Sequence, residues 1–189
     1  MKAFALTCIM MLSALLGYAQ EVLSFKGIPV EGSVKSFGEQ LVEKGFSKIS
    51  EEEGKPIFYG DFTGTSAVVM LTPDADGSTL NSVVVALNPS KEWRVLASSY
   101  TYYKQIYTDK YGEPFESIET TPAGSDSNTA QMLALSDGKA NYKTTWVNPH
   151  GIIALSIIKA DEPMQGMITI CYFNRQTLDS QMQNDLDEI

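Results

Sequence analysis

Twice along the sequence, a segment of helical periodicity stops at a glycine and is followed by short β-rich segments. After Ser33, a favourable N-cap, apolar residues recur at helical spacing over 34–44, and Gly45 then ends the helix. A second stripe at i, i+3, i+4 spacing ends at Gly112, and Pro114 prevents the helix from restarting. Each glycine allows the sharp chain reversal that an antiparallel sheet needs.

Strands are predicted after both helices, because β-branched and aromatic residues alternate with turn residues there. In the first half, these strands lie near 56–63, 65–72 and 79–87. In the second half, they lie near 115–120, 141–148, 151–160 and 166–174, with a short helix capped by Asn128 after the first of them. The pattern predicts an α+β fold with two helix-plus-antiparallel-sheet halves packed side by side. A single domain with accidental symmetry is the alternative.

The N-terminus has the pattern of an export signal. Lys2 is followed by an apolar stretch over 4–16, which is too short to span a membrane. Gly17 and Ala19 supply small residues at the −3 and −1 positions, so cleavage is expected before Gln20. A cleavable signal peptide predicts a periplasmic or extracellular protein. A retained N-terminal anchor is the alternative.

The predicted organisation divides the chain into five parts. They are a signal peptide at 1–19, an extended lead-in at 20–32, a first half at 33–89, a second half at 90–174 and a C-terminal helical tail at 175–189. No later apolar run reaches the roughly 18 residues of a membrane span, so no transmembrane segment is expected in the mature chain.

Charge and cysteine content narrow the function classes. The net charge is −9 and the basic residues are scattered, which argues against nucleic acid as a partner. Cys8 lies inside the signal and is expected to be lost with it, although a lipidated Cys8 is the other interpretation. Cys171 then remains alone, so no intramolecular disulfide is possible.

The residues that carry chemistry do not assemble into a recognised motif. His150, the single histidine, lies in the turn NPHG, and Cys171 lies within a predicted strand as a small buried hydrophobe. A zinc site would need several such ligands, and no Gly-x-Ser-x-Gly elbow is present. The sequence therefore predicts no catalytic residue, no metal site and no cofactor, with a Cys171–His150 nucleophile pair as the alternative.

Acidic residues offer two further alternatives. The segment DADGSTLN over 74–81 resembles part of a calcium loop, but the bidentate acid is missing and a hairpin turn explains its Asp and Gly residues. Acids on predicted strands, namely Asp61, Glu116 and Glu119, leave a glycosidase-like carboxylate pair open.

Tyrosines crowd the second helix. Tyr100, Tyr103, Tyr107 and Tyr111 lie on its apolar stripe and are expected to pack on the sheet, whereas Tyr102 falls off the stripe and is expected to be exposed.

A recognition surface is predicted on the sheet. Helices on one face leave the other face open to water, where amphipathic side chains are suitable. Tyr142, Thr144 and Trp146 share one face of their strand by alternation, and Tyr59 shares a face with Asp61 in the first half. Tyr59, Tyr142 and Trp146 are therefore predicted to line a ligand-binding surface on the open face.

Three segments carry a resemblance: FKGIPVEGSVKSFGEQLVEKGF, YKQIYTDKYGEPF and TTWVNPHGIIALSI. They resemble small secreted proteins of unknown function from gut Bacteroidota. The repeated helix-plus-strands pattern also resembles the β-lactamase-inhibitor-protein type of tandem α/β fold. That second resemblance implies a protein-binding role by analogy.

Together these observations predict a secreted, non-catalytic binding or protein-interaction module with a protein or glycan partner in the cell envelope. A hydrolase-like enzyme that acts on peptide or glycan in the envelope is the alternative.

The exported protein is expected to begin at Gln20, because signal peptidase cuts after small residues at −3 and −1. Intact mass and N-terminal sequencing of exported material measure this directly. A mass that still includes residues 1–19, or a lipid on Cys8, would contradict the cleavage prediction.

Overall fold

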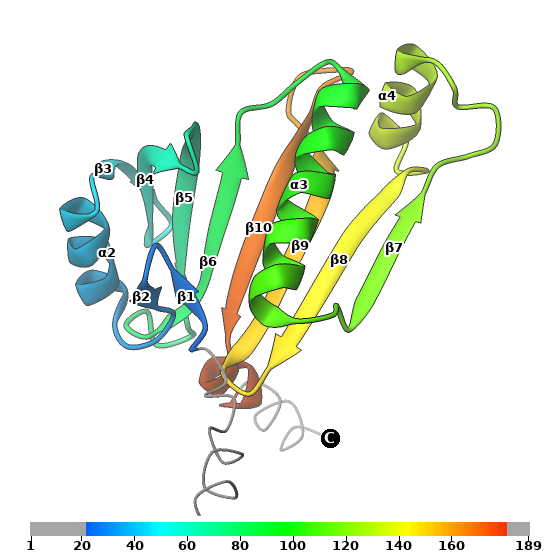
Figure 1. Ribbon diagram of the computed structural model, residues 1–189. Helices are drawn as coiled ribbons and strands as arrows, with labels where there is room; N and C mark the ends of the chain where they lie inside the picture. Colours follow the sequence, from blue (N-terminus) through cyan, green and yellow to red (C-terminus); the bar gives the residue numbers. More distant parts are fainter. Residues whose placement is uncertain (1–21, 181–189) are drawn as a thin grey trace, which may run out of the picture.

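An eight-stranded antiparallel sheet forms the centre of the molecule (Figure 1). The computed structural model describes residues 22–180, and the strand order in its large sheet is β3-β4-β5-β6-β10-β9-β8-β7. The prediction of an α+β fold with an antiparallel sheet is confirmed. The predicted signal peptide, its cleavage site and residues 181–189 of the tail lie outside the described residues.

The elements follow one another as helix and then strands, twice. The first series is α2 (Val34–Glu43), β3 (Ser47–Glu52), β4 (Lys55–Phe62), β5 (Thr65–Pro73) and β6 (Leu80–Leu87). The second series is α3 (Trp93–Tyr111), β7 (Glu116–Thr120), α4 (Asn128–Ser136), β8 (Asn141–Asn148), β9 (Gly151–Lys159) and β10 (Gly166–Asn174). A small hairpin of β1 (Ser24–Phe25) and β2 (Ile28–Pro29) precedes them, and residues 175–180 are helical.

Strand β3 is a fourth strand in the first series, where the sequence predicted three. Its segment, SKISEE, is exposed along its whole length and has no alternation of apolar and polar residues. It forms an edge of the sheet and pairs only with β4, with a bulge between Lys48 and Ser50. An edge strand with charged side chains discourages pairing with other chains, which explains why its sequence lacks a strand signature.

The two series meet at the pairing of β6 with β10. Both strands lie in the interior of the sheet, and buried residues oppose each other across the pair, as with Val85 and Ile170. The sheet is therefore continuous from one edge to the other. The division into domains at 33–89 and 90–174 stays a prediction.

The first helix has the predicted ends. The Ser33 side chain accepts a hydrogen bond from the Ser36 backbone N–H at 3.1 Å, which caps α2. At the other end Gly45 has a φ of +91°, and the Phe46 N–H donates to the Leu41 carbonyl at 3.1 Å. This left-handed turn directs the chain into β3.

The second helix is capped from a distance. Its N-cap position is Glu92, whose side chain makes no cap bond. Instead, Asn128 Oδ1 accepts from the Trp93 N–H at 2.7 Å. The predicted role of Asn128 as the cap of its own helix is wrong, because Ser127 caps α4.

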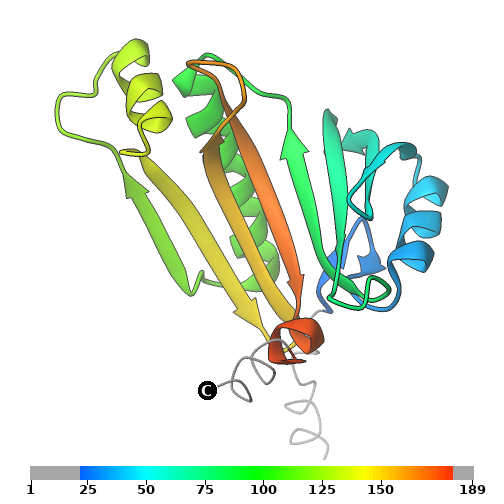
Figure 2. The same ribbon diagram turned by 180° about the vertical axis from the view of Figure 1, so that it is seen from behind.

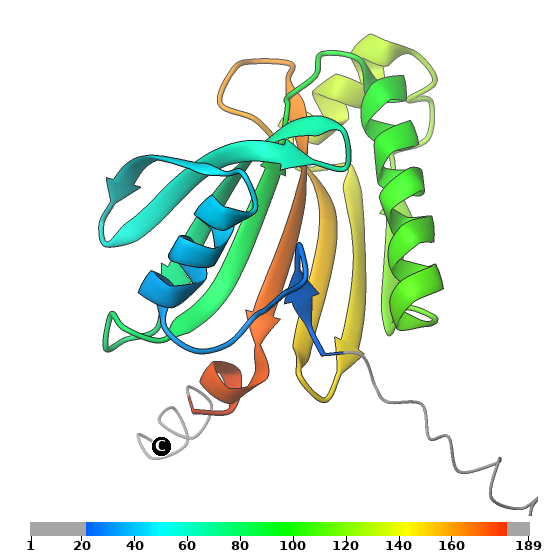
Figure 3. The same ribbon diagram turned by 60° about the vertical axis from the view of Figure 1, so that its left-hand side comes forward.

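The same face of the sheet is covered by helices α2 and α3 and by the β1–β2 hairpin (Figure 3). The hairpin lies between α2 and α3, and its Phe25 ring contacts side chains from both halves. Phe25 lies 5.9 Å from Phe46, 5.4 Å from Phe62 and 5.6 Å from Tyr172 between ring centroids. This aromatic cluster fills the space between the helices where the two series of elements meet.

Tyrosine hydroxyls of α3 reach polar partners inside the core. The Tyr100 hydroxyl lies 2.6 Å from Thr144 Oγ1 of β8, and Tyr107 pairs with Tyr172 of β10 through their hydroxyls. Desolvation raises the pKa of the Tyr100 and Tyr107 phenols above their ordinary value, so both stay neutral at physiological pH. The helix thus buries large aromatic rings with their hydroxyl groups hydrogen-bonded.

The Tyr100–Thr144 pair provides a test of this packing. Thr144→Val leaves the buried Tyr100 hydroxyl without this partner, and we expect the free energy of unfolding to fall by about 1–3 kcal/mol. Tyr100→Phe combined with Thr144→Val removes both polar groups, so the double variant should be more stable than the two single losses added together. Urea unfolding of the four proteins measures the coupling. Additive losses would show that the two hydroxyls do not interact.

Candidate functional site

The predicted recognition surface is split between the two faces of the sheet. Trp146 is 2% exposed and lies 5.5 Å from Tyr107 of α3 between ring centroids. Tyr142 is half-buried and packs edge-on against Trp93 and Tyr100, at 5.1 and 5.6 Å. The placement of Tyr142 and Trp146 on an open face is therefore wrong. The alternation of side chains along β8 correctly places Tyr142 and Trp146 on the same face of the sheet, but this is the face that α3 covers.

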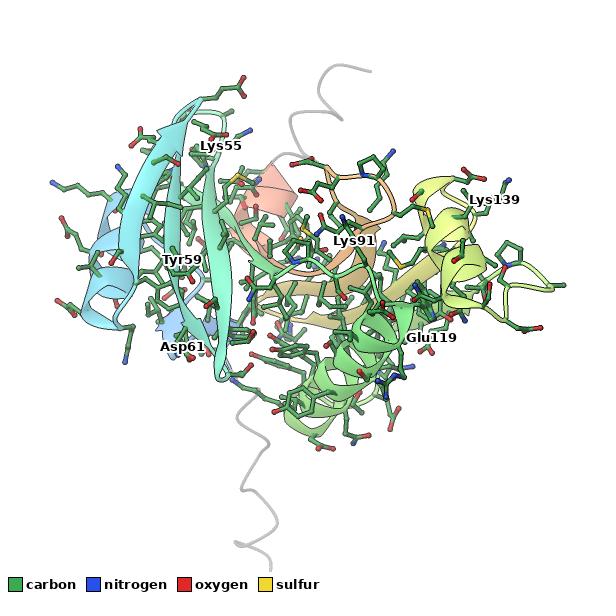
Figure 4. All side chains as sticks on the ribbon, turned by 90° about the horizontal axis from the view of Figure 1, so that it is seen from above. Lys55, Tyr59, Asp61, Lys91, Glu119 and Lys139 are labelled. Carbon is green, nitrogen blue, oxygen red and sulfur yellow. The ribbon has the colours of Figure 1, made fainter. Side chains whose placement is uncertain are left out.

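Tyr59 does lie on the uncovered face, where it is 46% exposed beside Val68 of β5. Asp61 shares this face, and its carboxylate accepts a hydrogen bond from the Gly64 N–H at 3.2 Å, which holds the β4–β5 turn. Figure 4 shows Tyr59 and Asp61 on one half of the molecule and Glu119 on the other, beside α3. Glu119 forms an ion pair with Lys104 at 2.6 Å. A ligand-binding role for Tyr59 stays a prediction.

The uncovered face is a broad surface of mixed polarity. Figure 2 shows that no described helix crosses β10, β9 and β8 on this side. Its exposed apolar side chains come from four strands and are Tyr59, Val68, Val147 and Ile158, which are 38–46% exposed. These apolar side chains are scattered over the face and do not form one continuous patch along a single strand.

Cys171 and His150 do not form a nucleophile pair. Cys171 is half-buried on the uncovered face of β10, rather than fully buried as predicted. His150 is exposed in the β8–β9 turn, and Asn174 is the β10 residue level with Gly151, which follows this turn. Along β10, Cys171 lies three residues from Asn174, a separation of about 10 Å at the usual rise per strand residue. The Cys171 thiol is therefore beyond hydrogen-bond reach of the turn that carries His150.

A groove of about 500 Å³ opens on the helix-covered side, between the N-terminal half of α3 and the β4–β5 turn. Figure 3 shows the β4–β5 turn reaching toward this part of α3. Four buried residues belong to its lining: Leu87, Leu96, Tyr103 and Ile168. The rest of this lining, which we call the α3 groove, consists of Thr63, Thr65, Asn88, Pro89, Ser90, Val95, Ser98, Ser99 and Tyr102.

Hydroxyl groups dominate the lining of the α3 groove, since seven of its thirteen side chains carry one. The Tyr103 hydroxyl lies 2.7 Å from Thr63 Oγ1 and so links α3 to the β4–β5 turn. The Tyr103 ring stacks on Phe62 at 5.8 Å. Burial raises the pKa of the Tyr103 phenol, which keeps this group neutral at physiological pH.

Tyr102 gives the groove an exposed aromatic ring. It is 54% exposed, which confirms the expectation from its position off the apolar stripe. Its ring meets the Tyr103 ring edge-on at 5.3 Å and an interplanar angle of 75°. An exposed tyrosine supplies apolar contact area and a hydrogen-bonding tip for a ligand.

The groove was not predicted from sequence, because its lining comes from four distant parts of the chain: 63–65, 87–90, 95–103 and 168. Only the exposed position of Tyr102 gave a local signal. The serines and threonines resemble ordinary turn and helix-surface residues until the fold brings them together.

The lining favours binding over acid–base chemistry. It contains no carboxylate, imidazole, thiol or amine group. Within residues 22–180, no group of three or more His, Cys, Asp or Glu residues is placed to hold a metal ion. No helix in this described range is long and apolar enough to cross a membrane.

Comparison of this chain with protein-family models, curated proteins and solved structures finds no match. The site must therefore be interpreted from its own geometry and chemistry.

Cys171 should react slowly with thiol reagents in the native protein. Burial raises the pKa of its thiol, so less of the reactive thiolate is present near pH 8 than in a free cysteine. We expect the native labelling rate to rise at a higher pH than the rate in denaturant. Labelling kinetics from pH 7 to 10 measure both curves. Coincident curves would show that the thiol is not desolvated in the folded protein.

Proposed function

We propose that this protein is an exported, non-catalytic binding module that holds its ligand in the α3 groove. The observation that carries the proposal is the composition of the lining, which combines hydroxyl and apolar side chains with no charged group. A volume of about 500 Å³ lies within the range of small-ligand sites, roughly 300–1,000 Å³.

The groove is built on rigid elements, which reduces the entropy lost on binding. The Asn128 side chain fixes the first turn of α3, and the Tyr103–Thr63 hydrogen bond ties this helix to the β4–β5 turn. Leu96 and Ile168, which are each 2% exposed, anchor the groove in the core. The exposed Tyr102 is the side chain best placed to gain contacts from a ligand.

The hydrolase alternative requires a general acid or base, or an activated nucleophile, at the bound ligand. The groove supplies none of these groups, and Cys171 lies on the other face of the sheet. The periplasm or the cell exterior is the proposed location, because the sequence begins with an export signal pattern. A protein or glycan of the cell envelope is then the expected partner.

Two tyrosine variants locate the binding site. Tyr102→Ala removes an exposed ring from the groove, and Tyr59→Ala removes a ring of similar exposure, 46% against 54%, from the opposite face. We expect Tyr102→Ala to weaken binding at least about tenfold, the loss typical of an aromatic anchor, with little change in melting temperature. Tyr59→Ala should leave binding unchanged.

The measurement is calorimetric titration with defined envelope oligosaccharides and peptides, followed by mass spectrometry of the recovered ligand. Recovery of intact ligand supports a binding module. Ligand cleavage by the native protein would instead establish the hydrolase. Loss of binding in Tyr59→Ala alone would move the site to the uncovered face and refute the groove.

A further inference from the structure

We infer that the α3 groove binds a neutral carbohydrate. This inference rests on the proposed binding function and specifies the chemical class of the ligand.

The ligand is expected to be uncharged because the groove offers no charge to pair with. No Lys, Arg, His, Asp or Glu contributes to the lining, and Tyr103 stays neutral because its burial opposes ionisation. A bound carboxylate, sulfate or ammonium group would lose its hydration without an opposite charge in return. The net charge of −9 further disfavours anionic ligands.

The polar groups match the hydroxyl groups of a sugar. Side-chain hydroxyls of Thr65 and Ser99 can both donate and accept hydrogen bonds, as sugar hydroxyls do, and the Asn88 amide adds separate donors and an acceptor. The Ser98 hydroxyl donates to the Val95 carbonyl at 3.1 Å and can still accept a hydrogen bond. The C–H face of a pyranose ring is apolar and suits contact with an aromatic ring. Tyr102 provides such a ring beside these hydroxyls.

An extended peptide fits this place less well. Peptides commonly bind by adding a strand to a free sheet edge. The edges of the large sheet are β3 and β7, whereas the strands that contribute to the groove, β5, β6 and β10, each pair on both sides. The groove thus offers side-chain groups and no free strand edge.

The test is titration of the mature protein with three panels of equal length. They are neutral oligosaccharides (α- and β-linked glucans, mannans and N-acetylglucosamine oligomers), the corresponding uronate-containing or sulfated oligosaccharides, and neutral polar peptides. We expect saturable binding of at least one neutral oligosaccharide, and at least about tenfold weaker binding of its anionic counterpart.

Variants assign that binding to the groove. Tyr102→Ala should lower the affinity at least about tenfold, Tyr102→Phe should retain most of it because the ring remains, and Tyr59→Ala should match the native protein. Circular dichroism and melting curves of each variant verify folding.

The outcomes separate this inference from the proposed function. Peptide binding that depends on Tyr102, without carbohydrate binding, would overturn the carbohydrate inference and leave the binding function intact. A preference for anionic saccharides would also overturn it. Binding by any panel that is insensitive to Tyr102, or no binding at all, would refute the groove as the site.

Discussion

The pairing of β6 with β10 is the contact on which the rest of the structure depends. Each of these strands is the last of the four large-sheet strands in its own series, and their antiparallel register places Val85 opposite Ile170 in the core. Because the pair joins both series into one sheet, a single hydrophobic layer extends from α2 to α3. Separate sheets would leave β6 and β10 as unpaired edges at this point, and unpaired edges promote association with other chains.

One consequence is that all the large aromatic residues of the core collect on one face. Tyr100 and Tyr107 find hydroxyl partners on β8 and β10, so most of the polarity buried with them is hydrogen-bonded. Trp146 is an exception, since its indole N–H has no acceptor among the described residues. Burial of the large indole ring against Tyr107 offsets the cost of that unpaired group.

A second consequence is the location of the α3 groove. It lies where the two series meet, and its residues come from the β4–β5 turn of one and from α3 of the other. Neither series contains the groove alone. The Tyr103–Thr63 hydrogen bond spans this junction, so the shape of the proposed site depends on how the two halves dock.

The sequence by itself determined the local elements and their periodicity. Ser33, Gly45 and Gly112 mark helix ends because capping and left-handed turns are local properties of the backbone. Alternation likewise placed Tyr142 with Trp146 on one face. These features were predictable because each depends on residues that lie within a few positions of one another.

Only the tertiary structure decided which face the helices cover, since alternation is the same for either choice. It also decided that Asn128 caps α3 from 35 positions away and that β3, with no apolar pattern, joins the sheet edge. The α3 groove likewise depends on the tertiary structure, because its hydroxyl side chains come from distant segments and form a site only when packing brings these segments together.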